Sequence, residues 1–366
     1  MTDSGTEQKT HLHEDRHRIQ FMYFSQEDLL QAGCLDFHLA IDTTAKSLLA
    51  HRQGDVMFPE KIVQIFDEQT QRRINCLPAT LKSEKVCGMK WVSVFPPNVD
   101  HYGLQNLTAL FVLSEIEKGF PIAVMEGTLA SNLRVAAIGA LAAKYFAPVE
   151  PKVIGFIGAG EQAKMHLLAM KTIRPTLEEC RVSAKTAMEE ELFIEQMERI
   201  EPSMRFVPAH TQGAAAMSEA DILVTATSAQ APLLKAAWMK PGSFYSHIGG
   251  WEDEYAVAKQ CDKIVCDDWE TVKHRTQTLS RMYKDGELSD KDVHGNLDEV
   301  VAGEKAARED PAERVYFNAV GLSYVDVAIA LAMYHRAIEH GFGQQLTLQE
   351  TTIFEHQQIN NWVRMS

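Results

Sequence analysis

The sequence lacks any long hydrophobic run. No window reaches the roughly 18 consecutive apolar residues from which a membrane-spanning helix is inferred, so we expect no transmembrane segment. The N-terminal residues 1–17 are polar and contain no apolar stretch of the kind that a secretory signal peptide requires. Both absences favour a cytoplasmic protein.

Cysteine is scarce, and its spacing follows no metal-binding motif. None of the six cysteines forms a Cys-x-x-Cys pair, a pattern typical of a cytosolic chain with reduced thiols. Cys261 and Cys266 can be read as metal ligands, but no partner pair accompanies them. We therefore predict no metal site.

Basic residues are in the minority. The chain has 36 Lys and Arg against 50 Asp and Glu, which gives a formal net charge of −14. A protein that binds nucleic acid or an anionic membrane needs a basic surface, so we expect neither partner. A small anionic ligand needs only a few local cations and is compatible with this charge.

What the sequence does contain is enough apolar material for two domains. The 366 residues are 45% hydrophobic and 23% charged, which are ordinary values for a globular protein. We read residues 1–18 as a disordered tail. Gln26–His51 and Thr128–Phe146 carry apolar residues at helical spacing and are predicted helices.

Strands and helices alternate from residue 153 onwards, over roughly 150 residues, which predicts a doubly wound parallel sheet. The expected strands are Val153–Ile157, Arg181–Ser183, Arg205–Val207, Asp221–Thr227, Ser243–Ile248 and Lys263–Cys266, and the helices are Glu161–Ile173, Ala187–Ile200 and Gly213–Glu219. We predict an α/β Rossmann domain over residues 149–314. Residues 315–366 break the alternation and are expected to join residues 19–148 in an α+β domain.

A glycine-rich loop follows the first of these strands. It reads Gly158-Ala159-Gly160-Glu161-Gln162-Ala163. In such a G-x-G-x-x-A motif, Gly158 permits the tight turn and Gly160 lets the backbone approach a pyrophosphate. The N–H groups of the following helix would hold the phosphates. We therefore predict a dinucleotide site; the alternative is a Rossmann-like fold without cofactor.

The end of the second strand bears on which nicotinamide cofactor is bound. An NAD site usually has an acid about 20 residues past the loop, but the stretch 183–186 contains none. Lys185 and Thr186 would suit a 2′-phosphate instead, so we favour NADP(H) over NAD(H). The alternative is that Lys185 is an ordinary solvated lysine.

A second contact with the cofactor is expected where a later strand ends. Thr225, Thr227 and Ser228 follow one another at the carboxyl edge of the sheet, where doubly wound folds bind ligands. Their hydroxyls would border the ribose and the nicotinamide. Ordinary turn chemistry explains the same residues nearly as well.

Three basic residues lie before the Rossmann domain, in segments that we expect to be structured. Lys90 lies in a strand-like run, Arg134 lies in the Ala-rich helix, and Lys61 follows Phe58-Pro59-Glu60. A buried charge is costly without a partner, and an anionic ligand would offset that cost. Arg is suited to bidentate binding of a carboxylate. The alternative for each is an ion-paired structural residue.

At this point the chain resembles the ornithine cyclodeaminase and mu-crystallin family. The matching features are Lys90-Trp91-Val92 with Pro97-Asn98, the stretch Gly119–Gly127, Leu133-Arg134-Val135-Ala136-Ala137, the glycine loop, and Phe317–Leu322 followed by Asp326. The resemblance implies a Rossmann domain and a second domain that binds substrate and forms a homodimer. It also implies that Lys61, Lys90 and Arg134 surround the substrate carboxylate, with Lys61 standing where the family usually has Arg.

The resemblance further implies hydride transfer between the nicotinamide and the α-carbon of an amino acid, through an imine. Lys90 is the general-acid candidate, because a buried Lys shifts its pKa readily, and Asp326 is a weaker one. Gly321 would lie near the nicotinamide, and Gly249 is a further candidate contact with the cofactor.

One departure from the family concerns the reaction. Cyclodeaminases carry an acid after a Gly-Gly pair at the end of a late strand, and this chain has Trp251 there. Glu252 and Asp253 would start from different directions. We therefore predict an NAD(P)-dependent imine reductase or amino-acid dehydrogenase. The alternatives are an ornithine cyclodeaminase and a non-catalytic NADP(H)-binding protein. Trp251 is a candidate for the wall of the substrate pocket; the alternative is an ordinary core tryptophan.

Overall fold

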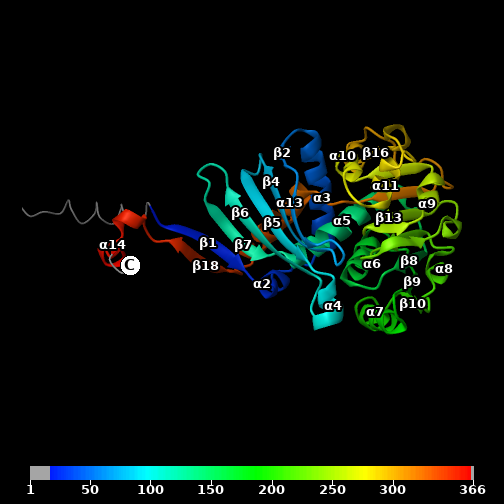
Figure 1. Cartoon of the computed structure of the whole chain (residues 1–366), viewed down its shortest axis with the longest axis horizontal. Coiled ribbons are helices and arrows are strands. Elements are labelled where there is room, and N and C mark those ends of the chain that lie inside the picture. Colours follow the sequence, from blue (N-terminus) through cyan, green and yellow to red (C-terminus); the bar gives the residue numbers. More distant parts are fainter. Residues whose placement is uncertain (1–16, 364–366) are drawn as a thin grey trace, which may run out of the picture.

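A computed structural model describes residues 17–363, and they form two eight-stranded sheets with helices packed around them (Figure 1). The part of the predicted tail at residues 1–16 lies outside the described residues. The strands of the first sheet are β1 (Ile19–Phe24), β2 (Val56–Met57), β3 (Ile62–Asp67), β4 (Arg72–Leu81), β5 (Val86–Val94), β6 (Leu107–Glu115), β7 (Pro121–Glu126) and β18 (Gln344–Gln349).

The first sheet is mainly antiparallel, in the order β18-β1-β7-β6-β5-β4-β2, with β3 paired to β4. Burial alternates along β4 and β5, as expected for strands with one covered face. Helices cover that inner face. The helices of this part of the chain are α2 (Gln26–Gln31), α3 (Phe37–Arg52), α4 (Pro97–Tyr102), α5 (Thr128–Phe146), α13 (Ser323–Glu339) and α14 (Ile359–Trp362).

The single helix expected over 26–51 is two helices, so the prediction of one continuous helix was wrong. Helix α2 ends before Gly33, whose φ of 74° lies in the left-handed region that favours glycine. Helix α3 begins after Asp36, whose carboxylate accepts a hydrogen bond from the backbone N–H of Leu39. The apolar periodicity hid this break because both helices face the same core.

The second sheet is entirely parallel, in the order β10-β9-β8-β11-β13-β17-β15-β16. Its strands are β8 (Val153–Ile157), β9 (Glu179–Ser183), β10 (Arg205–Pro208), β11 (Ile222–Thr225), β13 (Phe244–His247), β15 (Lys263–Cys266), β16 (Gly295–Asn296) and β17 (Val315–Asn318). Its helices are α6 (Glu161–Ile173), α7 (Ala187–Ile200), α8 (Gly213–Met217), α9 (Tyr255–Lys259), α10 (Trp269–Lys273), α11 (Thr278–Lys284) and α12 (Leu297–Val301). The predicted α/β fold with a doubly wound parallel sheet is confirmed.

The expected boundary at residue 315 falls one strand too early. Strand β17 lies inside the second sheet, between β13 and β15, and the chain returns to the first sheet only with α13. All four residues of β17 are buried. The sequence shows that this strand is apolar but carries no information on where it inserts in the strand order.

Helix α5 joins the two parts of the molecule. It leaves the first sheet after β7 and lies between the two sheets (Figure 1). Fifteen of its residues are buried, and most are small or aliphatic. Its apolar residues belong to one core cluster that also includes residues of both sheets. A polar residue on α5 is therefore held rigidly between the sheets.

Two smaller features complete the fold. Strands β12 (Gln230–Leu234) and β14 (Trp251–Asp253) pair as a short parallel ribbon beside the second sheet. Strands β1 and β18 extend from the first sheet as an arm that ends in α14 (Figure 1). Within residues 17–363 no helix has the length and apolar character needed to cross a membrane.

Candidate functional site

The glycine loop lies at the carboxyl edge of the second sheet, between β8 and α6. Gly158 has a φ of 106°, and a Cβ there would come within 2.5 Å of the carbonyl oxygen of Ala226. A Cβ on Gly160 would meet nothing within 4 Å. Gly158 is therefore required by the turn and its packing, whereas Gly160 leaves open space at the start of α6. No side chain caps that helix, so its first N–H groups are available to a phosphate.

The other residues of the loop lie on the first turn of α6. Gln162 donates to Asn132 Oδ1 on α5 at 2.8 Å, and its own Oε1 is buried without a partner in the part of the chain that the structure describes. Glu161 accepts from Lys164 at 2.6 Å on the exposed side. Ala159 is partly buried against the main core. The loop is thus tied to α5, and the side-chain carbonyl of Gln162 is a buried acceptor still free to bind a ligand.

The end of the second strand is open. Thr186 begins α7 and accepts from the backbone N–H of Glu189, so its hydroxyl serves as a helix cap. Lys185 is exposed, and its Nζ lies 3.7 Å from Asp100 Oδ2, which is also exposed. A surface pair of this kind contributes little stability, so Lys185 is free to turn toward an anion.

Glu252 organises the strand ends where β11 and β13 finish. Its carboxylate accepts from the hydroxyl of Thr225 at 2.9 Å, from the N–H and hydroxyl of Thr227 at 2.6 Å each, and from the N–H of Gly249 at 2.8 Å. The two threonine hydroxyls are therefore engaged inside the protein, while Ser228 is exposed. A Cβ on Gly249 would lie 2.5 Å from the carbonyl oxygen of Thr227, so glycine is needed for this close approach.

Lys90, Arg134 and Asp326 meet between the two sheets. Lys90 Nζ donates to Asp326 Oδ1 at 2.7 Å, and Arg134 Nε donates to the same oxygen at 2.8 Å. They come from β5, α5 and α13, and all three are buried. Asp326 Oδ2 has no hydrogen-bond partner among residues 17–363. Two of the cations predicted from the sequence and the weaker acid candidate thus form one cluster.

Burial and mutual charge set the proton affinities in this cluster. Burial, together with the charge of Arg134, lowers the pKa of Lys90 to about 8, against the opposing effect of Asp326. Burial alone would raise the pKa of Asp326, but Arg134 and Lys90 outweigh it and hold that pKa below its usual value. Asp326 is therefore a carboxylate at neutral pH, and Lys90 is an ammonium close to releasing its proton.

Gly321 brings the edge of the second sheet against this cluster. Its φ is 88°, and a Cβ there would lie 2.6 Å from Nη1 of Arg134. Asp267, at the end of β15, accepts from the backbone N–H groups of Val320 and Gly321 at 2.9 and 2.8 Å. The loop after β17 is thereby fixed next to Arg134. At this point the carboxyl edge of the second sheet, which carries the glycine loop, meets the cluster of Lys90, Arg134 and Asp326.

Lys61 belongs to the same region, together with two cations that the sequence reading missed. Burial lowers the pKa of Lys61 to about 7, and Arg275, Arg73, Lys90 and Arg134 lower it as well, in that order of effect. Arg73 lies on β4, and Arg275 lies in the loop after α10. The alternation of β4 was the only sequence signal for Arg73, and nothing in the sequence indicated Arg275.

Trp251 and its two acidic neighbours make their contacts outside this cluster. The guanidinium of Arg281 lies 4.5 Å from the centre of the Trp251 ring, and no hydrogen bond or ring contact of the described residues joins this tryptophan to Lys90, Arg134 or Asp326. Asp253 accepts from Tyr316 and Thr278 deep in the second sheet. Neither Glu252 nor Asp253 is available as a substitute for the cyclodeaminase acid.

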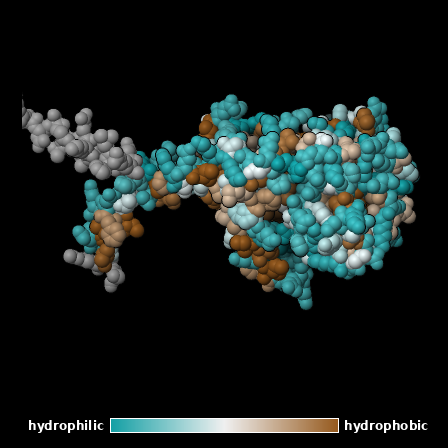
Figure 2. Space-filling model, turned by 90° about the horizontal axis from the view of Figure 1, so that it is seen from above, coloured by the Kyte–Doolittle hydropathy of each residue, from teal (hydrophilic) through white to brown (hydrophobic). Residues whose placement is uncertain are grey.

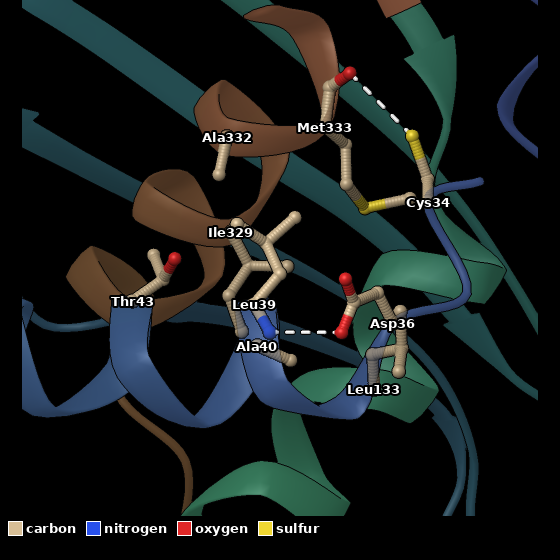
Figure 3. A pocket seen from close by; sticks show the side chains of 9 residues that line it. All are labelled: Cys34, Asp36, Leu39, Ala40, Thr43, Leu133, Ile329, Ala332 and Met333. Atoms are coloured by element: carbon tan, nitrogen blue, oxygen red, sulfur yellow. Dashed lines mark hydrogen bonds between the residues drawn. The ribbon is translucent and has the colours of Figure 1, made fainter. Parts of the chain in front are cut away.

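A hollow between α3, α5 and α13 is separate from this region (Figure 3). Its lining is mostly apolar, with Leu39, Leu133 and Ile329 facing one another, and it has no room for a water molecule. Burial raises the pKa of Cys34 at its edge to about 11, so this thiol stays protonated. The hollow is a packing defect rather than a substrate site. Within residues 17–363, no group of three or more His, Cys, Asp or Glu is placed to hold a metal ion.

Comparisons with known proteins identify the family of the chain. The family model described as ornithine cyclodeaminase/mu-crystallin matches residues 29–341. An alanine dehydrogenase from Archaeoglobus fulgidus is 33% identical over 335 residues, which cover 90% of this chain and 98% of that protein.

Two solved structures are also similar. The Δ1-pyrroline-2-carboxylate reductase of Thermococcus litoralis, in complex with NADH and L-proline, aligns with a TM-score of 0.83 and 28% identity over 88% of this chain and 99% of that one. An archaeal alanine dehydrogenase dimer with bound NAD aligns with a TM-score of 0.82 and 29% identity over 90% of this chain and 100% of that one.

Proposed function

The chain belongs to the ornithine cyclodeaminase/mu-crystallin family, and we propose that it is an NAD(P)-dependent reductase of an imine formed from an α-oxo acid and an amine. The same site would run the reverse reaction, the oxidation of an amino acid. The observation that carries the proposal is the buried Lys90–Asp326–Arg134 cluster, because it lies directly against Gly321 at the edge that holds the glycine loop.

The carboxyl edge of the second sheet, with its glycine loop, fits a dinucleotide. The open space at Gly160 and the uncapped N-terminus of α6 would take the pyrophosphate, and the ends of β13 and β17 would border the nicotinamide. When bound, the reduced cofactor supplies a hydride. The balanced reaction is imine plus NAD(P)H plus H⁺ giving secondary or primary amine plus NAD(P)⁺: the hydride pair forms the new C–H bond at the imine carbon, and a proton forms the N–H bond.

The chain's own residues have distinct roles in this reaction. Arg134, with Lys61, would bind the α-carboxylate, and so orient the α-carbon toward the nicotinamide edge. Lys90 would deliver the proton to the imine nitrogen, because its pKa of about 8 places it near the optimum for proton transfer. Asp326 holds Lys90 and Arg134 in position and keeps Lys90 charged.

The cyclodeaminase alternative lacks its acid. That reaction needs a carboxylate beside the substrate amine, and the position holds Trp251, while Glu252 and Asp253 are bound within the second sheet. We therefore favour net reduction over recycling of the cofactor. Production of ammonia and proline from ornithine, without net NAD(P)H turnover, would reverse this preference.

We further propose NADP(H) over NAD(H) as cofactor. The loop after β9 has no acid to bind the ribose hydroxyls, and Lys185 is exposed beside it. Titration of the protein with NADPH and NADH, followed by cofactor fluorescence, tests this. Lys185→Ala should weaken NADPH binding and leave NADH binding unchanged; an equal effect on both would contradict the preference.

A homodimer completes the proposal, with the unit around the first sheet binding substrate and forming the interface. The outer face of that sheet and the exposed strand β3 carry a set of exposed apolar side chains, and Figure 2 shows hydrophobic surface over this part of the molecule. They are Ile62, Val63, Ile65, Phe66, Trp91 and Leu110. An Ile65→Asp/Phe66→Asp double variant should be monomeric by analytical ultracentrifugation if this face is the interface.

The decisive experiment measures turnover. Purified protein is given NADPH or NADH with a panel of α-oxo acids and amines and with cyclic ketimines, and oxidation of the cofactor is followed by absorbance. We expect oxidation with at least one pair and its loss in Arg134→Gln, which should still bind the cofactor. A wild type that binds cofactor but turns over nothing on this panel would instead indicate a non-catalytic binding protein.

A further inference from the structure

Arg73 points from the same face of the first sheet as Lys90. Burial alternates along β4, and Leu77 pairs with Lys90 of β5 across a buried pair of positions. Arg73 lies four residues from Leu77, so its side chain leaves the same face of the strand. The adjacent Arg72 leaves the opposite face and pairs with Asp67. The cation at position 73 is thus directed toward the inner face, beneath which the substrate cluster lies.

Arg275 reaches this region from the second sheet. It lies two residues before Gln277, whose Nε2 donates to the carbonyl oxygens of Gly249 at 2.8 Å and Ala319 at 3.0 Å. Its Nε is buried and has no partner within the described residues. Glu60, Asp267 and Asp268 lie within electrostatic range of Arg275, but none forms an ion pair with it. Its guanidinium therefore remains available to an anion.

A single carboxylate cannot form hydrogen bonds with all of the cations in this region. A carboxylate has about four acceptor positions, which a bidentate Arg134, Lys90 and one further donor would fill. Lys61 has no hydrogen-bond or ion-pair partner among residues 17–363, and burial together with the neighbouring cations already lowers its pKa to about 7. Within the described part of the chain, Arg73 donates only to the carbonyl oxygen of Gln71. Leaving these charges without an anion is unfavourable.

Two buried acceptors without partners lie in the same region. Asn75 is 8% exposed and leaves β4 on the same face as Arg73, and no described residue donates to its Oδ1. Asp326 is fully buried, and no described residue donates to its Oδ2. Because buried acceptors are nearly always satisfied, both are open to the N–H donors of a ligand.

We propose that Arg73 and Arg275 form a second anion subsite, so that the substrate carries a carboxylate on its amine part in addition to the α-carboxylate held at Arg134 and Lys61. The inference rests on the proposed function and narrows it: the imine is formed between an α-oxo acid and an amino acid, and the product is a secondary amine with two or more carboxylates. Asn75 and Asp326 would accept from the nitrogen that joins the two halves.

A matched pair of substrates tests this. Pyruvate with methylamine gives an imine with one carboxylate, and pyruvate with glycine gives the same imine with two. We expect the wild type to prefer the glycine pair in kcat/KM. Arg275→Gln and Arg73→Gln should lower kcat/KM for the glycine pair roughly ten- to hundredfold and affect the methylamine pair much less. Arg72→Gln, on the other face of β4, should alter neither.

Binding separates failure of the subsite from failure of the reaction. Titration calorimetry with NADP⁺ present compares the two products, N-carboxymethylalanine and N-methylalanine. Tighter binding of the dicarboxylate that Arg275→Gln abolishes would support the subsite even if nothing is turned over, and the proposed reaction would then be wrong. Turnover of both pairs at equal kcat/KM, equal affinity for both products, or binding of neither would overturn the subsite.

Discussion

Lys90 Nζ lies 2.7 Å from Asp326 Oδ1, and this short ion pair is buried between two sheets. The pair joins β5 of the first sheet to α13, which follows directly from the last core strand of the second. Water has little access to either group, so each one governs the charge of the other. The proton on Lys90 is therefore the property of the site most sensitive to substitution.

The pH dependence of imine reduction should show two steps. Lys61 loses its proton as pH rises through about 7, and Lys90 loses its proton as pH rises through about 8. Binding of the carboxylate needs the first cation and proton donation needs the second, so kcat/KM should fall across both values. The oxidative direction needs neutral Lys90 and should rise through about 8. Lys61→Met should remove the lower step only. A profile of kcat/KM that stays flat from about pH 6 to about pH 9 would contradict both assignments.

Replacing Asp326 by Asn should move the pH profile. The carboxylate raises the pKa of Lys90 through its charge and its hydrogen bond, so its removal lowers that pKa below about 8. The falling limb of kcat/KM for reduction should then shift to lower pH. The variant should also be less stable, by roughly 3–5 kcal/mol, because two buried cations lose their partner. A less stable variant with an unmoved limb would show that Lys90 is not the proton donor.

Two alanine substitutions in the glycine loop should separate folding from cofactor binding. Gly160→Ala adds a Cβ into open space, so its melting temperature should stay near the wild-type value while the affinity for NADPH falls at least roughly tenfold. Gly158→Ala is strained by its φ of 106° and by the carbonyl of Ala226, so it should lower the melting temperature itself. Thermal unfolding without cofactor and fluorescence titration with it measure the two effects. An unchanged affinity of Gly160→Ala for NADPH would show that the pyrophosphate does not bind at this loop.

Much of the framework could be predicted from the sequence because it is local. The apolar period of Thr128–Phe146 gave helix α5 with its observed bounds, and the apolar run Val153–Ile157 gave β8. Lys90 and Arg134 could be identified as candidates because a charged side chain within an apolar segment needs a partner. That reasoning does not depend on knowing what faces the charge.

The rest depends on register and strand order, which the sequence carries only weakly. Arg72 and Arg73 are adjacent, and a shift of one residue decides which of them faces inward. Arg275 lies in a loop whose position is set by the contacts of Gln277 with two strand ends. Strand β17 is inserted between β13 and β15, although it follows them both in sequence. Each of these is a tertiary choice among locally equivalent arrangements.

Glu252 offers a test of how the strand ends are held. Its carboxylate accepts four hydrogen bonds from Thr225, Thr227 and Gly249, and it is fully buried. Glu252→Gln replaces one acceptor oxygen by a donor amide that faces N–H and O–H groups, so at least one buried donor loses its partner. We expect a loss of about 2–5 kcal/mol in urea unfolding, with weaker NADPH binding because Gly249 is no longer fixed. Glu254→Gln, at a partly buried neighbour with one long contact, should change stability by less than about 0.5 kcal/mol. Equal stability of the two variants would mean that the strand ends are held by packing alone.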